Sequence, residues 1–370
     1  MQKLYILILA GIFPLILVSC DLADKPADGP EDEIVVVADS LEYQSLKGSL
    51  ETAFEKTIYT PQPEKLFSLK LITPDEIERY RNSKNIIIIA PYRSGSKTSR
   101  LISAVIDTSV KNKVINSGEN FIKRNDLWAK DQLVMFMTAP TANDLDSAIV
   151  RKKGQLICAF QKASDKRLIS SLYDPRFEKR DAEGKLLNDY GWTIYIPQDY
   201  RIEQENSTSN FVWLRNSPQK DVERWIFVHW IDNATPDYLN SDSVNAVRNR
   251  ITNRFYGSGK NLNSIRIAEN YYTSAEINFK GRYAILTQGL WENKERRSSG
   301  PFINYTFYDE KSRRVYMVDG AVYTSPKYYK RNLIQQVDVT LQSFMTENEV
   351  SADRKKLLME AAKDYKISKK

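Results

Sequence analysis

Apolar and polar positions alternate along the first half of the chain in blocks that predict strands and helices in turn. Three short apolar runs are typical of buried strands: residues 34–38 (IVVVA), 85–90 (NIIIIA) and 133–138 (LVMFMT). Helical patterning covers residues 46–56, and a long helix is expected over 143–171. Because strands alternate with helices, the pattern predicts an α/β or α+β layer domain over residues 34–175.

The pattern changes after a charged and polar stretch, residues 176–190, which we interpret as a linker. Helices are expected beyond it over 242–255 and 326–344. Residues 191–346 are predicted to form an aromatic-rich α+β domain with a mainly antiparallel sheet, so the whole chain is α+β with an α/β-like first half. Six blocks rich in aromatic and β-branched residues are its expected strands: 192–196, 211–215, 224–231, 275–291, 303–308 and 315–323.

The N-terminus has the pattern of an export signal. One basic residue is followed by an apolar run from Leu4 to Val18, which is shorter than the roughly 20 residues that a spanning helix needs. The run ends in Leu17-Val18-Ser19-Cys20, which resembles a bacterial lipobox. The resemblance implies that residues 1–19 are a signal peptide and that Cys20 carries acyl chains, palmitate among them. The alternative is an uncleaved anchor in which Cys20 is incidental.

Residues 20–33 are predicted to be an acidic tether, because positions 21–33 contain four Asp, two Glu and two Pro and almost no apolar side chain. Acidic residues after a lipidated cysteine resemble the surface-export signals of Bacteroidota lipoproteins. Asp21 directly after the cysteine also resembles the inner-membrane retention signal of proteobacteria. The sequence leaves both alternatives open, and we place the protein in the cell envelope, at the outer membrane, on its periplasmic or surface face.

The amino-acid composition excludes several kinds of functional site. Hydrophobic residues make up 42% of the chain and charged residues 27%, which is ordinary for a globular protein. Two Cys and one His exclude zinc clusters and disulfide frameworks, so we expect no metal and no cofactor. Cys158, in an apolar helical stretch, is expected to pack as a small hydrophobe. Residues 351–370, within the basic tail 347–370, supply +4 of the net charge of +7, so we expect no nucleic-acid partner.

Catalytic candidates are few. His229 alternates with Phe227 and Trp225 on one strand face, which favours a packed or hydrogen-bonded sheet histidine over a catalytic one. The segment 95–98 (GSKT) follows a strand but lacks the first glycine of a phosphate loop and does not open a convincing helix. Two carboxylates of the second half could flank a glycoside as acid and base, and the candidates are Glu276, Glu292, Asp309 and Asp319.

Aromatic side chains of the second half offer a candidate ligand or partner surface. The residues singled out are Trp213, Trp291, Glu292 and Tyr305, because aromatic rings beside a carboxylate suit sugars and peptides. The alternative is that these rings fill the core of an antiparallel sheet. No catalytic residue is assigned from the sequence.

Short motifs occur in a fixed order along the chain. In the first half they are 34–39 (IVVVAD), 85–89 (NIIII) and 125–133 (NDLWAKDQL); in the second they are 191–192 (GW), 211–214 (FVWL), 289–292 (GLWE), 299–302 (SGPF) and 318–323 (VDGAVY). This succession resembles domain-of-unknown-function family 4837, whose members are Bacteroidota lipoproteins. The motifs span nearly the whole chain after Cys20. The resemblance implies an exported lipoprotein and no particular activity.

Three Asp-Ser pairs precede an apolar or small residue and resemble the periplasmic O-glycosylation signal of Bacteroidota. Their serines are Ser40, Ser147 and Ser243. For the last two, capping of a helix is the alternative.

The sequence as a whole favours a lipid-anchored envelope protein that is a non-catalytic binding or assembly module. Its partners would be the membrane, through the lipid, and an unidentified envelope protein or glycan. The alternative is a carboxylate-dependent hydrolase acting on envelope glycans.

Overall fold

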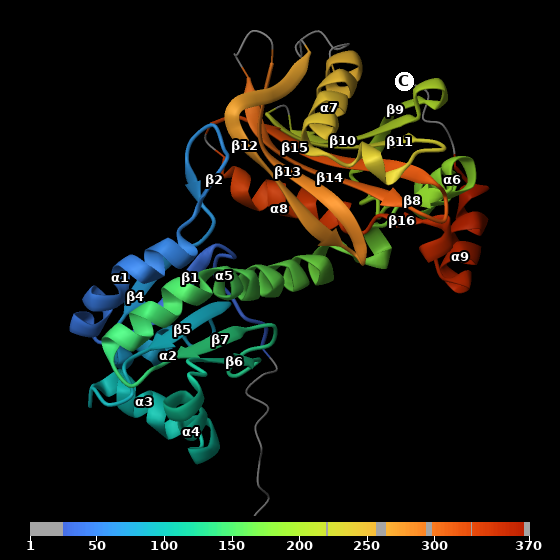
Figure 1. The fold of residues 1–370 in the computed structure, drawn as a ribbon. Coiled ribbons are helices and arrows are strands. Elements are labelled where there is room, and N and C mark those ends of the chain that lie inside the picture. The colour runs from blue at the N-terminus through green and yellow to red at the C-terminus, as the bar shows by residue number, and fades with distance from the viewer. Residues whose placement is uncertain (1–24, 220, 257–263, 294–297, 327, 366–370) are drawn as a thin grey trace, which may run out of the picture.

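The structure is a computed structural model that describes residues 25–219, 221–256, 264–293, 298–326 and 328–365. It confirms an α+β fold, built as two domains around two separate sheets (Figure 1). The first sheet is mostly parallel and the second is wholly antiparallel, so the two halves are not copies of one topology.

The first domain has a five-stranded sheet of order β4-β1-β5-β7-β6. All neighbours run parallel except the edge strand β6, which is antiparallel to β7. The central strands β5 and β7 are buried along their whole length because helices cover both faces. The strands are β1 (Glu33–Val37), β4 (Ser68–Ile72), β5 (Asn85–Ile89), β6 (Phe121–Asn125) and β7 (Leu133–Met137).

Two helices lie on one face of this sheet, α1 (Ser40–Phe54) and α5 (Ala142–Leu172). Three shorter helices cover the other: α2 (Ile77–Tyr80), α3 (Lys97–Val105) and α4 (Thr108–Ser117). A small hairpin, β2 (Thr57–Ile58) with β3 (Glu64–Lys65), follows α1. The expected strands and the long helix of this half are confirmed, whereas α3, α4 and β6 were not predicted.

The second domain has a seven-stranded sheet of order β12-β13-β14-β15-β11-β10-β9. Helix α7 (Ser241–Phe255) packs on one face, and α8 (Lys330–Leu341) packs on the other. The strands are β9 (Tyr200–Asn206), β10 (Phe211–Gln219), β11 (Val222–Ile231), β12 (Ile265–Phe279), β13 (Arg282–Asn293), β14 (Ser299–Asp309) and β15 (Arg314–Thr324).

The single strand expected over 275–291 is wrong, since these residues belong to the hairpin of β12 and β13. The turn lies at Lys280 and Gly281, which have φ angles of 55° and 87°. Only Gly281 marks this turn in the sequence, and an asparagine–glycine or aspartate–glycine pair is absent there.

The linker expected at 176–190 is also wrong, because α6 (Arg180–Tyr190) occupies most of it. Helix α9 (Ala352–Ala362) packs against α6 so closely that a Cβ on Gly184 would lie 2.0 Å from the Leu358 carbonyl oxygen. Glu183 is buried and accepts a hydrogen bond from Arg354 Nη2 at 2.6 Å. The expected tail therefore contains a docked helix. A short ladder of β8 (Trp192–Thr193) and β16 (Met345–Thr346) completes this corner.

Helix α5 links the two domains and reaches from the first sheet to the second domain (Figure 1). Its 31 residues give a length of about 46 Å. Near its end, Tyr173 Oη donates to the Val339 carbonyl oxygen at 2.5 Å, and Gln335 Nε2 of α8 donates to Asp165 Oδ1 at 2.8 Å. Glu64 of β3 accepts the backbone N–H of Arg331 at 2.8 Å, so the hairpin caps the start of α8.

Candidate functional site

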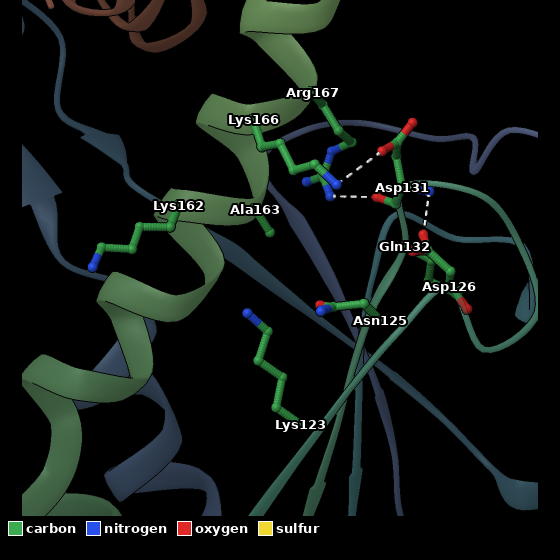
Figure 2. Close-up of a pocket in the computed structure, with 9 residues that line it drawn as sticks. All are labelled: Lys123, Asn125, Asp126, Asp131, Gln132, Lys162, Ala163, Lys166 and Arg167. Atoms are coloured by element: carbon green, nitrogen blue, oxygen red, sulfur yellow. Dashed lines mark hydrogen bonds and ion pairs between the residues drawn. The ribbon is translucent and has the colours of Figure 1, made fainter.

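A cavity of about 240 Å³ opens between the edge strand β6 and helix α5 (Figure 2). Four cationic and two anionic side chains line it, so the net charge of the lining is +2. We call it the lysine pocket. Its charged residues are Lys123, Lys162, Lys166, Arg167, Asp126 and Asp131.

Local structure explains why these side chains meet. Lys123 and Asn125 alternate with an intervening residue on β6 and so point to the same face of the sheet. Lys162 and Lys166 are one helical turn apart on α5 and share the face above that strand. Figure 2 shows Lys123 rising toward the helix and the Asn125 amide pointing into the same space.

The loop after β6 forms the closed end of the pocket. Asp126 and Asp131 have positive φ angles of 54° and 62°, which aspartate tolerates better than most residues. The Asp126 carboxylate accepts the backbone N–H of Asp131 at 2.5 Å. This bond holds the loop in its turn and directs the Asp131 side chain toward α5.

Arg167 forms the floor of the pocket and is fixed in place. Its guanidinium donates to Asn85 Oδ1 at 2.9 Å, to the Asp131 carbonyl oxygen at 3.0 Å and to the Glu31 carboxylate. Burial alone would raise the pKa of Glu31, but hydrogen bonds and charge from Arg167 and Lys84 hold that pKa below its ordinary value. Arg167 is therefore a structural cation.

The three lysines are the available cations. Lys166 Nζ lies 3.5 Å from Asp131 Oδ1, and its side chain is still 71% exposed. Among the described residues, Lys123 and Lys162 form no ion pair, and both are exposed. Flexible ammonium groups around a cavity can close on the oxygens of a carboxylate or phosphate. The pocket is therefore suited to an anion.

The aromatic residues singled out from the sequence do not form a surface. Trp213, Trp291 and Tyr305 are at most 7% exposed. The two tryptophans lie in the core under α7, whereas Tyr305 packs on the opposite face of the sheet. Glu292 is paired with Arg266 Nη2 at 2.9 Å across β12 and β13. Packing between the antiparallel sheet and the helices on its two faces accounts for the three rings, and the ion pair accounts for Glu292.

The carboxylates considered for hydrolysis are also separated. Asp319 is wholly buried against Arg248, with Nε–Oδ2 at 2.6 Å, and Asn304 donates to the same oxygen. Asp309 accepts from Ser312 in a turn, and Glu276 lies exposed on the edge strand β12. None of these lines the lysine pocket.

The prediction of a packed histidine is confirmed. His229 is 8% exposed, its Nδ1 lies 2.9 Å from the Asn210 carbonyl oxygen, and burial lowers its pKa. Residues 95–98, considered above as a phosphate loop, lie at the start of helix α3, contrary to expectation. Ser96 is the N-cap of that helix. Asp39 Oδ2 accepts the backbone N–H of Thr98 at 2.9 Å, so a side chain of the protein already satisfies that first turn.

The residues considered for glycosylation, lipidation or thiol chemistry differ in how exposed they are to solvent. Ser40 and Ser147 are exposed, at the start of α1 and on α5, whereas Ser243 is half-buried beside His229. Cys20 lies outside the described residues. Cys158 is half-buried rather than buried, because it lies on the flank of α5.

Comparison with known families divides the chain into two matched segments. Residues 178–343 match the family model of Domain of unknown function (DUF4837), and residues 27–173 match Domain of unknown function (DUF8532). The match to DUF4837 agrees with the resemblance of the second-half motifs. The first-half motifs at 34–39, 85–89 and 125–133, predicted above to belong to the same family, lie instead in the residues that match DUF8532. The boundary between the two matches falls just after α5.

Two solved structures resemble the chain weakly. The Ran-binding protein Mog1p of Saccharomyces cerevisiae is 10% identical, with 42% of this chain and 90% of that chain covered, at a TM-score of 0.29. LpqN of Mycobacterium tuberculosis, involved in cell envelope biogenesis, is 14% identical, with 42% and 85% covered, at a TM-score of 0.26. No curated protein matches the sequence.

Within the described residues, no helix combines the length and the apolar character that crossing a membrane requires. The longest, α5, carries charged side chains along much of its length.

Proposed function

We propose that this protein is anchored in the cell envelope by a lipid on Cys20 and acts as a non-catalytic binding module that holds an anionic group in the lysine pocket. The observation that carries the proposal is the grouping of three exposed ammonium groups around one cavity whose lining has a net charge of +2. The lipobox and the export signal support the location.

The geometry favours a small anion or one anionic group of a larger ligand. The cavity of about 240 Å³ lies below the roughly 300–1,000 Å³ of drug-sized ligand sites. Lys123 and Lys166 approach from opposite walls, and Asn125 and Gln132 add amide groups that can orient an oxygen. Arg167 is not available to a ligand, since its donors are engaged with Glu31, Asp131 and Asn85.

The test is calorimetric titration of the full chain with inorganic phosphate. The variant Lys123→Gln/Lys162→Gln/Lys166→Gln is expected to bind at least tenfold more weakly. A matched control, Lys56→Gln/Lys311→Gln/Lys356→Gln, removes the same charge from exposed positions outside the pocket and is expected to keep the affinity. An equal loss in both variants would show that only the net charge matters, and the proposed site would be wrong.

The anchor is tested separately by intact mass. We expect the native protein to lack residues 1–19 and to carry acyl chains on Cys20. The Cys20→Ala variant is expected to keep its signal peptide and to carry no acyl chain. Extra mass in hexose-sized steps that disappears in Ser40→Ala would add glycosylation, since Ser40 is exposed at the start of α1. An unmodified mature N-terminus would contradict the anchor.

A glycan hydrolase is the second candidate, favoured by one observation. Asp126 and Asp131 line the same cavity, although the carboxylates expected from the sequence do not. Both have other partners, since Asp126 accepts a backbone N–H and Asp131 faces Lys166. Incubation with purified peptidoglycan tests it: release of soluble fragments by the protein but not by Asp126→Asn would establish the hydrolase.

A further inference from the structure

We propose that the lysine pocket faces the membrane that holds the lipid anchor, and that the group it binds is the phosphate of an anionic phospholipid. This inference rests on the proposed anchor at Cys20 and names the source of the anion.

The course of the N-terminal segment supports it. The Lys25 carbonyl oxygen accepts the backbone N–H of Lys130 at 2.9 Å, and the N–H of Ala27 donates to the Lys130 carbonyl oxygen at 2.8 Å. The next residue, Asp131, lines the lysine pocket and carries the carbonyl group bound by Arg167. The first described residues of the chain are therefore fastened to the rim of the pocket.

The length of chain before this fastening limits how far the pocket can lie from the bilayer. Five residue steps separate Cys20 from Lys25, and a fully extended chain covers at most about 18 Å in that distance. Acyl chains on Cys20 would place its backbone at the membrane surface. Lys25, which is hydrogen-bonded to the backbone of Lys130, must then lie within about 18 Å of the membrane surface.

Charge complementarity selects the occupant. Lys25 and Lys130 are exposed cations, and Lys130 directly precedes Asp131, which lines the pocket. Each lysine near an anionic bilayer contributes an attraction worth about fivefold in affinity. A phospholipid phosphate offers the pocket an anion that the anchor itself holds at high local concentration.

A competing occupant lies on the same chain. Asp21 and Asp24 come shortly before Lys25 in the sequence and carry carboxylates, which are anions of the kind that lysines bind. Their carboxylates would fill the pocket without any lipid, and the experiment distinguishes them by substitution.

The experiment measures the reactivity of individual lysines toward an amine-acetylating reagent by mass spectrometry. The full chain, purified with its native N-terminus, is reconstituted into vesicles of neutral phosphatidylcholine or of phosphatidylcholine with 30% phosphatidylglycerol. We expect at least threefold lower reactivity at Lys123, Lys162 and Lys166 in the anionic vesicles alone, with no change at Lys311 and Lys356. High salt should abolish the protection, since the contact is electrostatic.

Each other outcome contradicts the inference. Equal reactivity in both vesicles would mean that the pocket does not face the bilayer. Protection in neutral vesicles that is lost in Asp21→Asn/Asp24→Asn would assign the pocket to the acidic tether. Protection in neutral vesicles by added glycerol phosphate, without protection by phosphatidylglycerol, would make the ligand a soluble anion. If phosphate fails to bind in calorimetry, or Cys20 carries no lipid, the proposed function itself fails.

Discussion

Substituting Asp338 by asparagine should stabilise the protein at alkaline pH. Asp338 lies on α8, half-buried, and accepts a hydrogen bond from Tyr305 Oη at 2.7 Å. Asp165 on α5 faces it across the junction of the two domains. Burial chiefly, together with the charge of Asp165, raises the pKa of Asp338 to about 6, against the opposing hydrogen bonds of Tyr305 and Gln342. Burial also raises the pKa of Asp165.

The sign and the size follow from linkage. Because the folded state raises this pKa, the contribution of Asp338 to stability is fully present below the unfolded value of 3.8 and is lost as the pH rises through about 6. A rise of about 2 units corresponds to at most about 3 kcal/mol between the two protonation states. Asparagine resembles the protonated acid in shape and keeps an oxygen for Tyr305, so it retains the stabilisation at every pH.

The assay is urea denaturation of the full chain at pH 4, 6 and 8. We expect Asp338→Asn to match the wild type at pH 4 and to exceed its unfolding free energy by up to about 3 kcal/mol at pH 8. The exposed Asp364 provides a control, since Asp364→Asn should show no such trend. A destabilised Asp338→Asn at pH 8, or a difference that does not change with pH, would refute the reasoning.

Three further predictions concern the second domain and the anchor. Arg248→Met should lower the unfolding free energy by about 3–5 kcal/mol, because Asp319 is left buried without its cation; adding Asp319→Asn should restore most of it, as denaturant midpoints would show. Gly320→Ala should lower the unfolding free energy by about 1–3 kcal/mol, since the added Cβ would lie 2.1 Å from Val337 Cγ1. Its control in the first domain, Gly48→Ala on α1, adds a Cβ in open space and should raise the unfolding free energy by about 0.5–1 kcal/mol. Cross-linking of intact cells should recover a defined envelope partner with the wild type and lose it with Cys20→Ala, while recovery of the monomer alone would contradict the assembly role.

Long apolar runs made most of the fold predictable. The strands β1, β5 and β7 are buried on both faces, so their sequences are apolar after the first residues Glu33 of β1 and Asn85 of β5. Helix α5 is long enough for its pattern to be recognised. Helix α6 was not predicted because two of its buried residues, Glu183 and Gly184, are not apolar side chains that would mark a buried helix face. They are buried because α9 packs against them. Such contacts between distant segments leave no periodic signal.

The lysine pocket was missed for a related reason. Its residues come from an edge strand that is apolar only at Phe121 and Ile122, and from the exposed side of α5. Exposed lysines are common on any helix, and Lys123 meets Lys166 only because β6 pairs with β7 at the sheet edge beside α5. By contrast, Trp291 and Tyr305 were predicted to lie on a surface because they are aromatic. Whether such a ring is exposed depends on which faces of the sheet α7 and α8 cover, and the sequence does not show this.

Native mass spectrometry of the protein extracted from its own membrane tests the central claim most directly. The account predicts a polypeptide that begins at Cys20, carries acyl chains and retains a phosphate-containing species that the Lys123→Gln/Lys162→Gln/Lys166→Gln variant loses. A chain without acyl groups whose bound species, if any, is unchanged in that variant would contradict it.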